Sequence, residues 1–497
     1  MNEIINHELP VIKTRIMFCT GRWLTGGMER KMTNLFRGLV KYYDIYLLTV
    51  GSEKSVIEIP QEIKKIVMSE NEFNENYSDK ALEQAKKHKI DVVIGVMNLF
   101  YGQLDLYEKC HQNRIKTIAA NSEYFFYPHH DSHLYNVVSR RQEVFKLVDA
   151  VLWQTNFSTS VYNHINSNGY VMPNPNTFSR QIKLAKKNKK IIICVGRFND
   201  YIKRIDRILT CFNKVLKQEP EAILWLVGPC DRELKIEKLG KKSIKDMMKE
   251  QKLNDSQIVF FGEINEVEKY YCQASVLLMT SESEGFCNVI NEAACFGLPL
   301  VCNNIPGLED IVIDGYNGLL SQQNDIDALA NNVCRILSDN KLRETIGYQA
   351  SKYVERFGIE EIVIKWRKVI NTVKSCSSAS DIKNKLNAEF SHKINDYYDF
   401  CVVLSSELNK ALGTSSNNLN MIYKDIDANN KNVDIANGQL IDAKKKLDDA
   451  TSNLEFITNQ YLGVINSRTW KITSPLRDTN ATIKKIVNHI KIMRKNS

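Results

Sequence analysis

Two glutamates, Glu284 and Glu292, lie in a stretch whose residue types suit the binding of a hydroxyl-rich ligand. The apolar run 287–296 predicts a helix, so Glu284 precedes it and Glu292 lies about two turns inside it, roughly 12 Å further along the axis. Gly285 leaves backbone N–H groups open at the positive helix end, where anions and hydroxyls bind well. The carboxylates could accept hydrogen bonds from sugar or ribose hydroxyls. A solvated helix cap with surface acids would carry the same spacing.

A second charged set follows the strand predicted at 190–195. Gly196 lets the backbone turn, Arg197 can hold a phosphate through two hydrogen bonds, and Lys203 adds a point charge. Together the two cations could neutralise a diphosphate leaving group without a metal ion. The alternative interpretation is a basic surface turn at the start of a helix.

Short apolar segments alternate with helical patterns and predict the scaffold for these residues. In the first half, strands are expected at 15–20, 45–50, 92–96, 117–120 and 150–154. In the second half they are expected at 190–195, 222–228, 258–261, 277–280 and 300–302. This alternation predicts doubly wound parallel sheets, which bind ligands beyond the carboxyl ends of their strands. Gly26 and Gly27 follow the first strand, where either a ligand loop or a plain tight turn would need them.

Taken whole, the stretch Ser281–Glu309 closely resembles the donor-site motif of the retaining GT-B glycosyltransferases of the group-one family (family four). Further matches to family elements are Gly26–Arg30 (G-G-x-E-R), Val171–Pro175 (the interdomain segment), Gly196–Lys203 (G-R-x-x-x-x-K) and Asp314–Leu320 (G-x-N-G-L-L). The resemblance extends over roughly residues 13 to 373 and is most specific in the second half.

The resemblance implies an α/β GT-B fold, in which two Rossmann-like domains face a cleft and a closing helix, here Glu361–Val369, crosses back to the first domain. It implies that Glu292 binds the donor ribose and that Glu284 lies beside the donor sugar. Arg197 and Lys203 would stabilise the leaving diphosphate, so Glu284, Arg197 and Lys203 are the predicted catalytic residues. The other predicted donor contacts are Gly26, Gly27, Gly262, Gly285, Phe286, Cys287 and Asn288. The nucleotide-diphosphate sugar would be a co-substrate, and no cofactor or metal is expected.

One segment departs from the family pattern. Relatives place a histidine close to the donor sugar in the loop after the strand at 117–120, where this chain has Asn121, Ser122 and Glu123. Glu123 is a candidate polar contact. A later histidine could serve the acceptor side, or none could; the candidates are His129, His130 and His133.

Length and composition limit the class of protein. A chain of 497 residues exceeds one core, so two or three domains are expected. Its 43% hydrophobic and 25% charged residues are typical of soluble globular proteins. The sequence shows neither a run of about 18 uncharged apolar residues nor the pattern of a signal peptide. Its 12 cysteines lack metal-ligand spacing, which favours a reducing cytoplasm.

The last part of the chain carries a different pattern. Mostly apolar residues recur every seven positions from Leu419 to Tyr461, and a second series follows three residues later. This predicts a coiled coil of about 70 Å that joins copies into a homo-oligomer, or else a helical hairpin packed on its own chain. The last 30 residues hold eight Lys/Arg and one acid, a net +7, around one apolar helical face. Such a helix suits an anionic membrane surface, or a solvated or partner-facing end, and its few aromatics argue against nucleic acid.

We therefore expect an acceptor domain (1–175), a donor domain (176–373), a linker and helix (374–418), a coiled coil (419–466) and a basic amphipathic tail (467–497). The expected enzyme is a metal-independent retaining hexosyltransferase that moves a sugar from a nucleotide-diphosphate donor to a surface polysaccharide or lipid-linked glycan. It would be cytoplasmic, either free or bound peripherally to the inner face of the plasma membrane. The main alternative is a catalytically impaired GT-B-like scaffold subunit, and a GT-B-fold sugar-nucleotide epimerase is a minor one.

Overall fold

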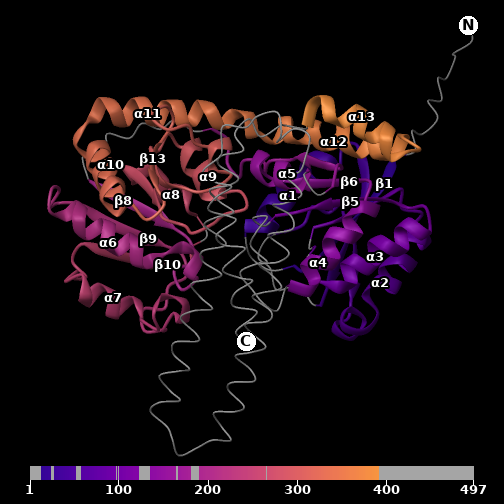
Figure 1. The fold of residues 1–497 in the computed structure, drawn as a ribbon, viewed down its shortest axis with the longest axis horizontal. Coiled ribbons are helices and arrows are strands. Elements are labelled where there is room, and N and C mark those ends of the chain that lie inside the picture. The colour runs from indigo at the N-terminus through magenta and orange to yellow at the C-terminus, as the bar shows by residue number, and fades with distance from the viewer. Residues whose placement is uncertain are drawn as a thin grey trace, which may run out of the picture.

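The computed structural model describes residues 13–23, 27–51, 58–96, 98, 100–122, 135–163, 166–180, 190–264 and 266–390. These residues form two α/β domains (Figure 1). Several predictions fall outside the described residues: the coiled coil, the basic tail, and the candidates Gly26, Glu123, His129, His130 and His133.

The first domain is built on a parallel sheet, whose described strands run in the order β3-β2-β1-β4-β5-β6-β7. The strands are β1 (Thr14–Arg22), β2 (Tyr43–Val50), β3 (Lys64–Met68), β4 (Val92–Gly95), β5 (Lys116–Ala120), β6 (Ala150–Trp153) and β7 (Gly169–Val171). The helices are α1 (Gly27–Leu39), α2 (Glu70–Lys87), α3 (Tyr101–Gln112), α4 (Tyr135–Val144) and α5 (Asn156–Asn163).

The second domain repeats the design, with the described strands in the order β10-β9-β8-β11-β12-β13. The strands are β8 (Ile191–Val195), β9 (Ile223–Val227), β10 (Ile258–Gly262), β11 (Val276–Met279), β12 (Leu300–Asn304) and β13 (Leu319–Gln322). The helices are α6 (Ile205–Leu216), α7 (Ile244–Glu250), α8 (Glu268–Gln273), α9 (Asn288–Cys295), α10 (Ile326–Ser338) and α11 (Asn340–Tyr353).

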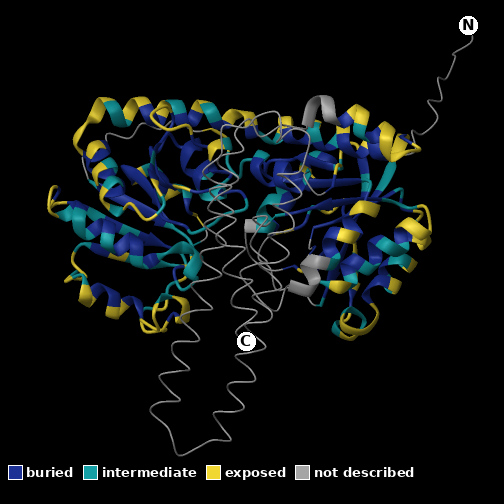
Figure 2. Ribbon diagram, in the orientation of Figure 1, coloured by how far each residue is buried: buried dark blue, intermediate teal, exposed yellow. Residues whose placement is uncertain are grey.

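Continuous apolar strands explain why both sheets are covered on two faces. In β1, Ile16 and Phe18 belong to one core cluster, whereas Met17 and Cys19 belong to the cluster on the opposite face. Successive side chains of a strand point to opposite faces, so a strand buried on both sides must be apolar throughout. Figure 2 shows the result, with buried strands in the middle of each domain and exposed residues on the outer helices.

Helices that follow the second domain complete the first one. Helix α12 (Ile359–Ser375) packs on α1, and its Trp366 lies 6.0 Å from Phe18 between ring centroids. Helix α13 (Ala379–Phe390) continues along the same domain and buries Ile382 and Leu386 in the same core cluster (Figure 1). The closing helix expected at Glu361–Val369 lies within α12, and α13 lies in the segment predicted as a linker followed by a helix.

The packing of α12 makes a direct prediction about stability. Trp366 is 5% exposed, so Trp366→Ala should lower the free energy of unfolding by about 3–5 kcal/mol through lost burial and a cavity. Ile364 lies on the same helix but is 55% exposed, so Ile364→Ala should change it by less than about 0.5 kcal/mol. Denaturant unfolding monitored by circular dichroism measures both. Equal losses of unfolding free energy in the two variants would show that the packing of Trp366 against the first domain does not stabilise the protein.

Candidate functional site

The loop after β11 docks on the turn before α6. The Thr280 hydroxyl donates to the carbonyl oxygens of Lys203 at 3.0 Å and Arg204 at 3.2 Å. The Glu282 backbone N–H donates to the Ile202 carbonyl at 2.7 Å. Arg204 takes a left-handed φ of 51° where the turn meets α6. These contacts hold two segments together that are about eighty residues apart in the chain.

An ion pair forms where the two segments meet. The Lys203 ammonium lies 2.6 Å from Glu284 Oε1, and the Ser281 hydroxyl donates to the same oxygen at 2.7 Å. Burial works against the charged ammonium, but Glu284, with help from Cys287 and Asp200, outweighs it and leaves the pKa of Lys203 raised. Lys203 is therefore a cation at neutral pH and faces a carboxylate at the carboxyl edge of the sheet.

The neighbouring acid, Glu282, has a different role. Its carboxylate contacts Arg204 and Arg207, each at 2.7 Å, and its carbonyl accepts from the Gln323 amide at 3.0 Å. These contacts fasten the loop to α6 and to the segment after β13. Glu282 thus positions Glu284.

Glu292 lies on α9, at the junction of the domains. Tyr271 donates a hydrogen bond of 3.0 Å to its carboxylate. Burial raises the pKa of Glu292, while hydrogen bonds from Tyr271 and Thr177 and the charge of Arg30 act in the opposite direction. Arg30 belongs to α1 of the first domain, and Glu268, whose charge also acts on Glu292, belongs to α8 of the second. Charges of both domains therefore influence the pKa of this carboxylate.

Arg197 stands apart from the other charged residues. Its side chain is 76% exposed, and its Nη2 lies 3.5 Å from Asp200 Oδ2. The structure places Arg197 after β8 as predicted but does not bring its guanidinium into contact with Lys203 or Glu284.

Glycines line the carboxyl ends of β8, β9 and β10. A Cβ on Gly228 would lie 2.1 Å from the Gly196 carbonyl oxygen, and the Gly228 N–H donates to the Gly262 carbonyl at 2.8 Å. A Cβ on Gly262 would meet nothing within 4 Å, although its φ of +66° favours glycine. The three turns therefore pack backbone to backbone and leave an edge free of side chains beside Gly262.

The residues after Glu284 connect the site to the interdomain segment. Phe286 is buried edge-on against Phe357, with ring centroids 5.4 Å apart. Asn288 begins α9, and its Oδ1 accepts a 2.8 Å hydrogen bond from Asn174, which in turn accepts one of 2.6 Å from Gln154. Gly285 is partly exposed, and Cys287 is buried, which raises the pKa of its thiol.

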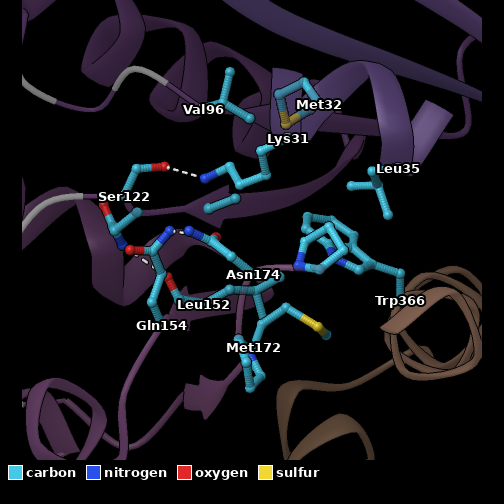
Figure 3. Close-up of a pocket in the computed structure, with 14 residues that line it drawn as sticks. Lys31, Met32, Leu35, Val96, Ser122, Leu152, Gln154, Met172, Asn174 and Trp366 are labelled. Carbon is cyan, nitrogen blue, oxygen red and sulfur yellow. Dashed lines mark hydrogen bonds between the residues drawn. The ribbon is translucent and has the colours of Figure 1, made fainter. Parts of the chain in front are cut away.

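The first domain contributes a lysine that sequence reasoning did not select. Lys31 follows the G-G-x-E-R match on α1, and its ammonium donates to the Ser122 hydroxyl at 2.9 Å. Figure 3 shows these two residues in a small pocket that Gln154, Asn174 and Trp366 also line. Gly27 is the first residue of α1. The signal that could have found Lys31 is its place one residue after the double-glycine match.

Among the described residues, no group of three or more His, Cys, Asp and Glu is placed to hold a metal ion. The one Asp-x-Asp string in the described range is structural: Asp325 caps α10, and Asp327 contacts Lys214 at 2.6 Å. The same range contains no helix long and apolar enough to cross a bilayer.

Comparisons with known proteins agree with this fold. Residues 175–353 match the family model "Glycosyl transferases group 1". An uncharacterized glycosyltransferase of Haemophilus influenzae is 26% identical, over 69% of this chain and 96% of its own length. The GalNAc-alpha-(1->4)-GalNAc-alpha-(1->3)-diNAcBac-PP-undecaprenol alpha-1,4-N-acetyl-D-galactosaminyltransferase of Campylobacter jejuni is 23% identical, over 73% of this chain and 99% of its own length.

The crystal structure of Anabaena HepE in complex with UDP and glucose shares the fold, with a TM-score of 0.61 at 16% identity, over 72% of this chain and 99% of that one. The two parallel-sheet domains are those of a GT-B fold. Together with the family match, this supports a glycosyltransferase of group 1.

Proposed function

We propose that this protein is a retaining glycosyltransferase that transfers a sugar from a nucleotide-diphosphate donor to a surface polysaccharide or lipid-linked glycan. The observation that carries the proposal is the Lys203–Glu284 pair, held at 2.6 Å beside the glycine-lined ends of β8, β9 and β10. The name of the Campylobacter relative, which includes an undecaprenol-linked glycan, supports the acceptor class.

Each polar residue then has a separate task. Lys203 and Arg197 stabilise the negative charge that develops on the leaving diphosphate, which is commonly the largest catalytic contribution. Arg197 is exposed in this structure and would turn toward the phosphates. Glu292 accepts hydrogen bonds from the ribose, and Glu284 orients the donor sugar with the backbone N–H groups around Phe286. Transfer with retention by front-face attack needs no nucleophile from the chain and, with two cations present, no metal.

A turnover assay separates this enzyme from the scaffold alternative. Glu284→Gln should lower kcat/KM on the order of 100-fold, because the sugar and Lys203 both lose a fixed carboxylate. Glu266→Gln, at a carboxylate that is 61% exposed, should leave it unchanged. The assay uses purified full-length protein with a panel of nucleotide sugars. Absence of both hydrolysis and transfer, with no nucleoside diphosphate bound, would contradict the proposal.

The raised pKa of Glu292 predicts how nucleotide binding depends on pH. Ribose hydroxyls need the carboxylate form, so binding lowers the pKa of Glu292 and releases protons. Affinity should therefore fall as pH drops through the raised pKa toward the ordinary value of 4.5. Calorimetry of a nucleoside diphosphate in two buffers with different ionisation enthalpies measures the proton release. Glu292→Gln should show less release, and equal release would argue against this role.

We further propose that the C-terminal region joins copies of the chain and contacts an anionic membrane. The sequence pattern supports this, and α13 fixes where a truncation should start, because its Ile382 and Leu386 belong to the core. Deleting residues after Phe390 should lower the mass seen in sedimentation and the fraction bound to anionic vesicles, while nucleotide binding persists. If both measurements are unchanged, the tail has another role.

A further inference from the structure

A second polar cavity, of about 240 Å³, lies between the two domains. The loops after β6 and β7 line it from the first domain, and the loops after β11 and β12 line it from the second. The segment 353–365, which leads from the second domain into α12, completes the lining. Neither Lys203, Glu284 nor Glu292 contributes to it. The residues that matter below are Gln154, Asn156, Asp310, Tyr353, Arg356 and Lys365.

Two cations face this cavity without an acid partner among the described residues. Lys365 is half-buried on α12, and no described acid forms an ion pair with it or with Arg356. Burial lowers the pKa of Lys365, and the nearby Arg356 lowers it further, while Glu361 opposes them. Arg356 donates to the Tyr353 hydroxyl at 2.8 Å and lies 5.0 Å from the centroid of that ring and 5.4 Å from that of Phe357. The rings orient the guanidinium and leave other N–H groups for a ligand.

The acids that line the cavity are already engaged. Both carboxylate oxygens of Asp310 accept hydrogen bonds from Asn156, one from its backbone N–H at the start of α5 and one from its side-chain amide. Glu309 accepts a 3.0 Å hydrogen bond from the Gly307 N–H. The carboxylates of Asp310 and Glu309 thus accept hydrogen bonds from N–H groups, and neither forms an ion pair with Lys365 or Arg356.

The two side-chain amides of the lining are held by partners of their own. The Gln154 amide N–H donates to Asn174 Oδ1 at 2.6 Å, and the Asn156 amide N–H donates to Asp310 Oδ1. A ligand suited to this cavity must therefore offer negative oxygens to the two cations.

We propose that this cavity binds a phosphate group, either as the free ion or as the head of a phosphate monoester. Lys365 and Arg356 hold its oxygens. Residues of both domains would contact the ligand, so its binding stabilises their present arrangement. Phe286 also lines the cavity, which connects the ligand to the loop that carries Glu284.

Calorimetry with the full-length chain tests this, with inorganic phosphate and glycerol 3-phosphate as probes. Lys365→Met and Arg356→Gln should each weaken phosphate binding at least about tenfold, because each removes charge-assisted hydrogen bonds. Lys352→Met, at an exposed lysine outside the cavity, should have no effect. The probe that binds more tightly identifies the free ion or the monoester as the source.

Lys203 and Arg197 are present in all these variants, so any phosphate that they bind contributes equally to every measurement. A difference in phosphate affinity between the variants therefore comes from the second cavity alone. Thermal unfolding in chloride checks that the variants fold, and Lys365→Arg, which keeps the charge, should retain binding. If Lys365→Met fails to fold, the phosphate affinity of Arg356→Gln alone tests the proposal. Wild-type affinity for phosphate in the cation variants, or no binding of either probe, would overturn the proposal.

Discussion

The candidate site depends on the ion pair between Lys203 and Glu284 and on the backbone contacts that bring the two residues together. Neither residue can reach the other unless the loop after β11 lies on the turn before α6. Hydrogen bonds from the Thr280 hydroxyl and the Glu282 backbone N–H form that contact. Ion pairs of the Glu282 carboxylate with Arg204 and Arg207 fix the position of the loop. Because Lys203 and Glu284 are both about four-fifths buried, their attraction is weakly screened by water. A ligand that displaces either partner must therefore replace a strong interaction.

The relation between the domains depends on polar contacts from several directions. Asn174 joins the interdomain segment to the first turn of α9, and Asp310 of the second domain caps α5 of the first. Helix α12 adds an apolar contact through Trp366. The cleft is thus bordered by groups that hydrogen-bond across it, and polar interfaces of this kind are typical of domains that move relative to one another.

The fold follows closely from sequence patterns, and the side-chain geometry follows less well. Fully buried strands such as β1 and β4 are predicted because their apolar runs are unbroken. Strand β3 was not predicted because most of its residues are exposed, and β7 was not predicted because it has only three residues. Periodicity reports burial, so weakly buried or very short strands leave little signal.

Among the site residues, Lys203 and Glu284 meet, whereas Arg197 turns to solvent, although all three were selected from the same motifs. Spacing along the chain sets where a backbone lies, but the direction of a long side chain depends on its local partners, here Asp200 for Arg197. Lys31 and Asn174 were not selected because their importance comes from contacts with Ser122 and Asn288, distant in the chain. Such pairings are invisible without the fold.

The position of α12 and α13 in the chain has a consequence for biosynthesis. Part of one face of the first sheet, beside α1, is covered by residues 359–390, which leave the ribosome after the whole second domain has been made. At a translation rate of about 5–20 residues per second, that part of the sheet stays uncovered for roughly 10–40 s after β7 has emerged. The nascent first half therefore presents an apolar surface during this interval, and chaperone demand should be greatest before α12 appears rather than after release.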